Sequence, residues 1–360
     1  MTNDDAAQRI ARAQREFDPE TVWLNSATLG LPPARVLTAV RAALQDWQCG
    51  RADAVAYDEP LTRARASYAE LVGVGADRVA VGSQVSVLVG VIASALPAGA
   101  EVLTVTGEFT SVTFPFWARG DLRVREVPPD ELAGAVREQT AWVAVSAVQS
   151  ADGRVLDLAA LRAACAHTGT RVLLDTTQAV GWLPVDAGDW AVTVCGAYKW
   201  LLHPRGAAYL TVAEDLLDTL VPTGAGWCAA EDKWAGIYGS PLRLAADARR
   251  FDVSPAWLCW VGAAPALELL SEVGRDTLHR HATGQAERFC RQVGLPFRGS
   301  AILSCHVEPA GEVAMAAAGI IGATRAARLR LAFHISTTDA DVDRAAAALA
   351  GLVHDIQPGN

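Results

Sequence analysis

The sequence predicts an α/β fold: a mostly parallel central sheet covered by helices, with a smaller α+β domain beside it. Continuous apolar runs, typical of strands buried on both faces, alternate along the chain with helix-like segments. Residues whose side chains can take part in catalysis or ligand binding follow these runs at their carboxyl ends, where open α/β sheets bind ligands. The composition shifts near residue 255, so we expect a large domain over 50–250 and a small domain made of 1–49 and 251–360.

The overall composition limits the class of protein. The chain has 360 residues, of which 51% are hydrophobic, and this is ample for a substantial core. A net charge of −9 argues against a nucleic-acid partner, and no apolar run is long enough to suggest a membrane span. The first 17 residues lack the apolar core of a signal peptide, and the seven scattered cysteines fit reduced thiols. We therefore expect a cytoplasmic protein without a metal site.

The N-terminal segment is expected to form a helix over 4–16 and then a loop. Residues 21–28 enter this loop, which Pro32 and Pro33 close. An Asn-Ser turn ahead of a proline-initiated helix explains the segment in purely structural terms.

A strand, a polar turn and an apolar helix are expected over 79–96. The turn contains Gly82, Ser83 and Gln84, and the helix covers 87–96. Free backbone N–H groups at the start of a helix bind phosphate well. Serine is also a common helix cap for structural reasons alone, so the turn permits both interpretations.

Two further strands are expected to lead into candidate site residues. The run 101–105 is followed by Phe109, and the run 141–146 is followed by Gln149 and Ser150. An ordinary core phenylalanine is the alternative to a site role for Phe109.

The next two strands end in residues of opposite charge. Residues 171–175 form a buried-type strand that ends in Asp175, and an apolar run beginning at Trp190 leads to Lys199. An aspartate is costly to bury unless a cation pairs with it. A lysine amine can form a Schiff base with an aldehyde cofactor, and a carboxylate can keep that cofactor's pyridine nitrogen protonated. Taken alone, Lys199 could equally be a surface lysine in a loop.

The pattern around these two residues resembles a known family. Asp175-x-x-Gln178-x-x-Gly181, then Lys199 and Pro204-Arg205-Gly206, is similar to the class V aminotransferase group of fold-type I pyridoxal phosphate (PLP) enzymes. The resemblance implies pyridoxal 5'-phosphate as cofactor, Lys199 as Schiff-base residue and base at the substrate Cα, and Asp175 at the ring nitrogen. It implies that Gln178 binds the phenolic oxygen, and that two copies form a homodimer with sites at their interface.

The resemblance also implies roles for residues elsewhere in the chain. The phosphate would be bound by the 82–84 turn, the ring would be stacked on Phe109, and a residue near 254 would reach the partner's site. The substrate side would be lined by the N-terminal loop and the 149–150 segment, with an arginine clamping the α-carboxylate. In this sequence these residues are Gly82, Ser83, Gln84, Phe109, Ser254, Asn25, Ser26, Ala27, Gln149, Ser150 and Arg330.

The sequence departs from the family pattern at several positions. Tyr198 precedes the lysine where histidine is usual, Gly196 replaces a hydroxyl that binds phosphate, and Phe109 replaces a histidine. Phe109 can stack on a ring but cannot transfer protons. Ser336 and Thr337 replace a Tyr-Asn pair.

The C-terminal part is expected to contain helices over 257–270, 275–293 and 339–353 and a strand over 301–307. The strand alternates, which places Cys305 on its core face. The desulfurase branch of the family needs a cysteine on a mobile polar loop, and the sequence shows no such loop.

These features lead to a functional hypothesis. We expect an enzyme that acts at Cα and Cβ of an amino acid, with β-elimination from a cysteine S-conjugate (a carbon–sulfur lyase reaction), in secondary metabolism, as the leading reaction. Transamination and amino-acid epimerisation remain alternatives. A binding module that has kept the fold is the non-enzymatic alternative, although such a module has no need of Asp175, Gln178 and Lys199 together.

Overall fold

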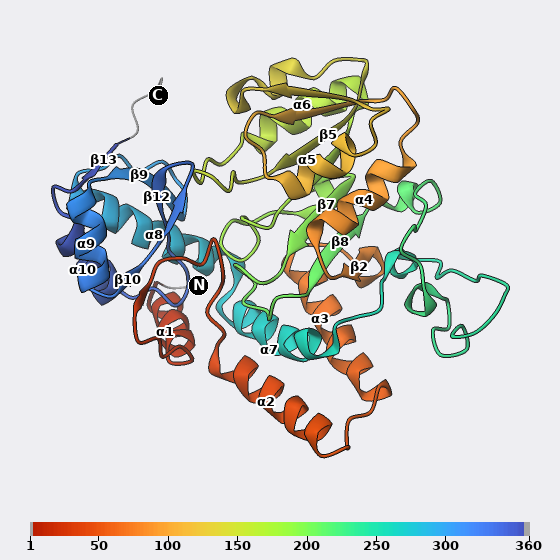
Figure 1. Ribbon diagram of the computed structural model, residues 1–360, viewed down its shortest axis with the longest axis horizontal. Coiled ribbons are helices and arrows are strands. Elements are labelled where there is room, and N and C mark those ends of the chain that lie inside the picture. The colour runs from red at the N-terminus through yellow and green to blue at the C-terminus, as the bar shows by residue number, and fades with distance from the viewer. Residues whose placement is uncertain (1–2, 356–360) are drawn as a thin grey trace.

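The computed structural model describes residues 3–355 and contains a seven-stranded sheet in its larger part (Figure 1). The strand order is β2-β8-β7-β6-β5-β3-β4, in which β8 runs antiparallel to its neighbours β2 and β7 and the remaining pairs are parallel. The mostly parallel sheet is thus confirmed. The strands are β2 Val79–Gly82, β3 Glu101–Val105, β4 Arg123–Val127, β5 Thr140–Ser146, β6 Arg171–Asp175, β7 Val192–Gly196 and β8 Ala208–Val212.

Helices cover both faces of this sheet. On one face α3 (Asp58–Leu71), α6 (Leu158–Thr168) and α7 (Trp257–Val273) contribute to the largest apolar core. On the other face α4 (Val85–Ala95) and α5 (Thr110–Trp117) form a second core. Six of the seven strands are mostly apolar because both of their faces are buried, whereas the edge strand β4 is polar and partly exposed.

The smaller domain has its own antiparallel sheet and its own core. The sheet order is β11-β12-β9-β13, and Leu303, Cys305 and Leu331 lie in this core, as the alternating pattern predicted for Cys305. Its elements are α8 Arg275–Val293, β9 Ile302–Val307, α9 Pro309–Ala317, β11 Ala323–Arg325, β12 Arg328–Ala332, α10 Asp339–Leu349 and β13 Val353–His354.

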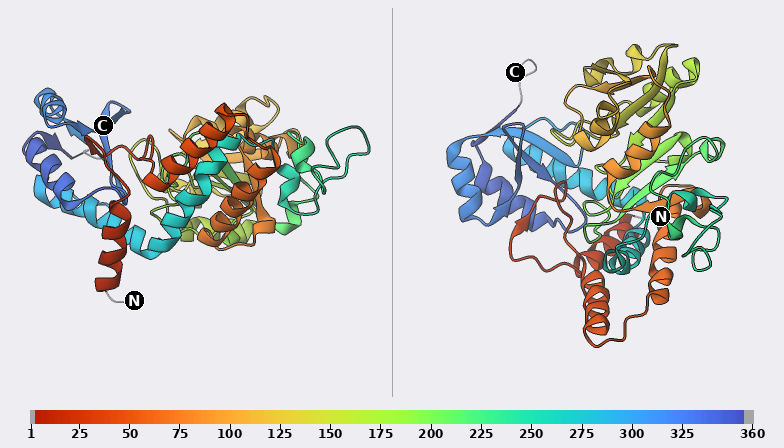
Figure 2. Two further views of the ribbon diagram at one scale, coloured as in Figure 1. Left: turned by 90° about the horizontal axis from the view of Figure 1, so that it is seen from below. Right: turned by 45° about the vertical axis from the view of Figure 1, so that its right-hand side comes forward.

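The N-terminal segment joins the two parts. Helix α1 (Asn3–Gln14) lies against α7 and α8 (Figure 2), and β1 (Val22–Trp23) pairs in parallel with β10 (Ile320–Ile321). Helix α2 (Ala34–Gln48) then packs on α7. Helix α7 lies after residue 250, but its side chains belong to the core of the larger part. The domain boundary at residue 250 therefore stays a proposal.

Some elements differ from the sequence-based expectation. The last helix ends at Leu349 instead of 353, since Gly351 has a φ of 72° and Val353 pairs with Val307 of β9. Helix α2 begins directly after Pro33, as the proline-initiated helix expected there does. Helices α3, α5 and α9 and the strands β1, β4, β10, β11 and β13 were not anticipated. Within residues 3–355, no helix combines the length and apolarity that crossing a membrane requires.

Candidate active site

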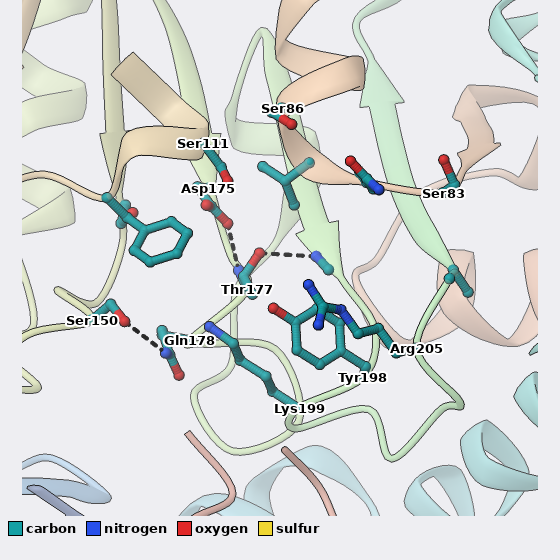
Figure 3. Close-up of a pocket in the computed structure, with 17 residues that line it drawn as sticks. Ser83, Ser86, Ser111, Ser150, Asp175, Thr177, Gln178, Tyr198, Lys199 and Arg205 are labelled. Atoms are coloured by element: carbon teal, nitrogen blue, oxygen red, sulfur yellow. Dashed lines mark hydrogen bonds between the residues drawn. The ribbon is translucent and has the colours of Figure 1, made fainter. Parts of the chain in front are cut away.

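The carboxyl ends of β6 and β7 and the start of α4 surround a cavity of about 410 Å³, a size typical of small-molecule sites (Figure 3). Half of the residues proposed from the sequence line it, and the other half do not. Those at the cavity are Ser83, Gln84, Phe109, Ser150, Asp175, Gln178 and Lys199. Those outside its lining are Asn25, Ser26, Ala27, Gly82, Gln149, Ser254 and Arg330.

Lys199 reaches the cavity from the loop after β7. Gly30 of the N-terminal loop packs on this backbone, since a Cβ at that glycine would lie 2.1 Å from the Lys199 carbonyl oxygen. The Gly30 N–H donates to the carbonyl of Tyr198 at 2.9 Å. Lys199 is only 5% exposed, and its burial lowers the pKa to about 8, so a substantial neutral fraction exists near neutral pH.

Asp175 ends β6 as a deeply buried carboxylate. Its Oδ1 accepts a hydrogen bond from the Thr177 N–H at 2.7 Å, and no cation among residues 3–355 forms an ion pair with it. Burial raises the pKa of Asp175 to about 6, only partly opposed by the hydrogen bonds from Thr177. The carboxylate is thus suited to a ligand atom that brings a proton or positive charge.

Gln178 is fixed by hydrogen bonds at both ends of its amide. Its Oε1 accepts from the indole N–H of Trp200 at 2.8 Å. Its Nε2 donates to the Ala27 carbonyl at 2.9 Å and to the Ser150 hydroxyl at 3.1 Å. Because an indole only donates and a carbonyl only accepts, the amide has one orientation. Ala27 therefore contributes by holding Gln178 through its backbone.

The start of α4 presents backbone N–H groups to the cavity. Gln84 occupies the cap position, and no side chain caps this end of the helix. Ser83, Gln84 and Ser86 line the cavity there. Gly82 has a different role from the one expected: a Cβ at Gly82 would lie 2.8 Å from Leu88, so this glycine lets α4 pack against β2.

Tyr198 and Arg205 complete this end of the cavity. The Arg205 guanidinium lies 5.3 Å from the centre of the Tyr198 ring. Gly196, where the family pattern has a hydroxyl, donates its N–H to the Thr177 hydroxyl at 2.8 Å. A hydroxyl is therefore supplied to this region by Thr177, two residues past the end of the neighbouring strand β6, and sequence spacing gave no signal for it.

Phe109 forms another wall. It is 45% exposed, and Lys199 Nζ lies 5.4 Å from its ring centre. The neighbouring Glu108 is buried and accepts hydrogen bonds from the Ser146 N–H at 2.8 Å and from Gln149 Nε2 at 3.0 Å. Gln149 is thus directed at Glu108 and away from the cavity.

The remaining candidates surround the cavity at greater depth or lie apart from it. Arg330 is 2% exposed and donates to the Ser150 backbone and, at 2.7 Å, to the Thr28 hydroxyl. Asn25 forms a backbone bridge to Ala332 of β12. Ser254 is exposed and lies outside the cavity. Lining residues without a role assigned from the sequence include Ser86, Ser111, Ser146, Thr177, Tyr198 and Arg205.

Comparisons with known proteins show which proteins this chain resembles. The family model for aminotransferase class-V matches residues 64–295. The chain is 28% identical over 305 residues to the uncharacterized aminotransferase YcbU of Bacillus subtilis, covering 78% of this chain and 81% of the relative. It is 29% identical over 399 residues to the kynureninase of Deinococcus radiodurans, covering 98% of this chain and 95% of the relative. The structure of the cystine C–S lyase C-DES with cysteine persulfide superimposes with a TM-score of 0.83 at 21% identity, covering 92% and 98% of the two chains.

Proposed function

This chain belongs to the aminotransferase class-V family and is a PLP-dependent enzyme, and on that premise we propose that it catalyses β-elimination from a cysteine S-conjugate. The observation that carries the proposal is the set of acid–base groups in the cavity. Among the described residues that line it, Lys199 has a pKa of about 8, and no histidine or cysteine is present.

The residues of the cavity fit the cofactor. Lys199 would hold its aldehyde carbon, Asp175 its ring nitrogen, and the uncapped start of α4 its phosphate. Asp175 supports this fit because it is buried without a cationic partner in the described chain. When bound, PLP supplies an electron sink that stabilises negative charge at the substrate Cα.

Lys199 performs the proton transfers in this proposal. Its neutral amine removes the Cα proton, the Cβ–S bond breaks with its electron pair on sulfur, and the resulting ammonium returns a proton to the thiolate. Hydrolysis of the released enamine gives pyruvate and ammonia. Phe109 packs beside Lys199 without offering a second proton-transfer group. One base is sufficient for this sequence.

The same cavity favours elimination over two related reactions. Epimerisation requires proton transfer on both faces of Cα. Of the two lining groups whose pKa lies near neutrality, Asp175 would be occupied by the ring nitrogen, which leaves Lys199 for the Cα proton. Sulfur transfer requires a reactive cysteine at the site. All seven cysteines lie outside the lining, and burial raises the pKa of Cys195, which is near Lys199 in sequence, to about 12.

The decisive experiment supplies S-substituted cysteines without a keto acid. Sustained release of pyruvate, ammonia and free thiol supports the lyase. If amino-group transfer occurs only after a keto acid is added, and no conjugate releases thiol, transamination replaces it. A binding module would show neither reaction.

Lys199 has its own test. Purified enzyme should be yellow, and borohydride should fix the cofactor to the peptide that contains Lys199, because about half of its buried amine is neutral at pH 8. A Lys199→Ala protein should take up PLP reversibly and lose the fixed label. Labelling of another lysine would remove Lys199 from this role.

We also propose that the enzyme is a homodimer. Large apolar side chains are exposed on α2, on α5 and on the segment 231–243 that projects from the sheet (Figures 1 and 2). They include Leu44, Trp47, Phe114, Trp117, Tyr238 and Leu242. Ser254 is also exposed, as a residue that serves the partner's site must be. Sedimentation of the enzyme, alone and with Trp47→Glu, tests the assembly.

A further inference from the structure

Two arginine side chains of the small domain converge on one hydroxyl of the N-terminal loop. Arg330 Nη2 donates to Thr28 Oγ1 at 2.7 Å, and Arg325 Nη2 donates to the same oxygen at 3.4 Å. Guanidinium groups only donate hydrogen bonds and are always charged near neutral pH. Two positive charges are therefore held side by side around one neutral oxygen.

Neither charge has a counter-ion within the described part of the chain. Arg330 and Arg325 form no ion pair with any carboxylate of residues 3–355. Arg330 is buried, and its Nε has no hydrogen-bond partner among those residues. Burial, and then the charge of Arg325, lower the pKa of Arg330 to about 10. This cluster is incomplete without an anion.

The hairpin that carries these arginines is built at a cost to stability. Ala326 and Ala327 in its turn have φ values of 47° and 58°, a region that alanine disfavours. The pairings Ala323↔Arg330 and Arg325↔Arg328 put the arginines of both strands on one face. Like charges directly opposite each other are unfavourable. The hairpin thus keeps its positive charges despite these costs.

The cluster is connected to the cavity. Arg330 donates to the Ser150 hydroxyl at 3.2 Å, and Ser150 lines the cavity and binds Gln178. Burial and, more weakly, the charges of Arg330 and Arg325 lower the pKa of Lys199, so both guanidinium groups act on the reacting end of the cavity. Arg330 is buried beside it, whereas Arg325 is exposed. One positive charge thus lies deep in the site, and the other lies at its surface.

We propose that the substrate carries two anionic groups: its α-carboxylate, bound by Arg330, and a second acidic group on its side chain, bound by Arg325. This inference rests on the proposed function for the reaction and adds the class of substrate: a cysteine S-conjugate whose leaving thiol bears a carboxylate. S-Carboxymethylcysteine has this form, and S-carbamoylmethylcysteine is its uncharged isostere.

The first test measures binding without chemistry. Adipate separates two carboxylates by four methylenes, as S-carboxymethylcysteine separates its own by four atoms, and it has no amine to react. Calorimetry on the PLP-loaded enzyme should show adipate binding about tenfold more tightly than its monoamide, since a charge-assisted contact is gained. Arg325→Gln should abolish that ratio, Arg325→Lys should retain part of it, and Arg330→Gln should weaken both ligands.

Arg328→Gln is the matched control. It removes a positive charge from the same hairpin, but Arg328 lines a separate hollow with Asp152 and Arg298. It should keep the adipate preference. Equal binding of adipate and monoamide, or a preference that survives Arg325→Gln, would overturn the proposal.

The second test uses turnover. Arg325→Gln should lower kcat/KM for S-carboxymethylcysteine about tenfold and leave S-carbamoylmethylcysteine unchanged; equal effects on both would contradict the assignment. If the enzyme releases no thiol from either compound, the lyase reaction is wrong, and the adipate preference still decides whether the site takes a dianion.

Discussion

Two buried regions of this enzyme carry charge, and they are built in opposite ways. In the first, Arg65 of α3 and Asp252 form an ion pair of 2.5 Å, and Asp252 also accepts from the Val81 N–H at 2.8 Å. In the second, at the cavity, Asp175 and Arg330 are buried as deeply but contact no opposite charge among residues 3–355. The first region is complete within the fold, whereas the second is completed by ligands.

The signs of the two unpaired charges identify those ligands. Burial raises the pKa of Asp175 to about 6 and lowers the pKa of Arg330 to about 10, so each group is pushed towards its neutral form. A protonated ring nitrogen at Asp175 and a carboxylate at Arg330 would reverse these shifts. Burial also raises the pKa of Asp252, but there Arg65 already opposes it.

The largest effect expected from this contrast is on the free energy of unfolding. Arg65→Met leaves Asp252 buried without a partner and should lower the free energy of unfolding by about 3–5 kcal/mol. Arg330→Met removes a buried charge that has no counter-ion, so it should leave the stability of the apoprotein unchanged or raise it. Urea unfolding of both apoproteins gives the comparison. Equal losses would mean that the two arginines serve the fold alike.

The aspartates should differ in turnover. Asp175→Asn keeps the shape of the side chain and an acceptor for the Thr177 N–H, so the enzyme should still bind PLP. The variant cannot hold the ring nitrogen protonated, and kcat should fall by about 10²–10³-fold, the magnitude typical for loss of one preorganised electrostatic contact. Absorbance measures the bound cofactor and product release measures kcat. Near-normal turnover would remove Asp175 from the role.

The central residues of the site could be predicted from the sequence alone. Asp175 and Lys199 could be predicted because each stands at or just beyond the end of a continuous apolar run, which is typical of a buried strand. Parallel strands end at one edge of a sheet, so the two residues are expected close together. The two residues are close together in the chain, so one family motif contains both of them. Strands β2, β3, β5, β6 and β7 and long helices such as α7 and α8 could be predicted for similar reasons.

The contacts that were not predicted join distant parts of the chain. Thr28 meets Arg330 across 302 positions, and Gln178 meets Ala27 across 151. Sequence periodicity describes one element at a time, so it could not show that Arg325 turns towards Thr28 or that Gln149 turns towards Glu108. Short elements such as β10 and β11 form only because tertiary pairing stabilises them.

The pH dependence of stability gives the finest test, since it isolates one carboxylate. The pKa of Asp175 is raised from 3.8 to about 6 in the folded apoprotein, so the folded state holds this proton more tightly than the unfolded chain does. The corresponding stability is present in full below about pH 4 and is lost as the pH rises through 6, by on the order of 2–3 kcal/mol. Asp175→Asn cannot ionise and does not lose it. Apo Asp175→Asn should therefore be more stable than the parent apoprotein at pH 7, and this advantage should shrink towards pH 4.5.

Asp130→Asn is the control for net charge in this measurement, because the Asp130 side chain is 83% exposed. It removes the same charge from the surface, and its difference from the parent protein should stay small over the whole pH range. Urea unfolding at half-unit steps from pH 4.5 to 7.5 compares the three proteins. Addition of PLP should reduce the advantage of Asp175→Asn, because a protonated ring nitrogen supplies the charge that the fold withholds. A flat difference for Asp175→Asn would mean that this carboxylate is already satisfied within the fold, as Asp252 is.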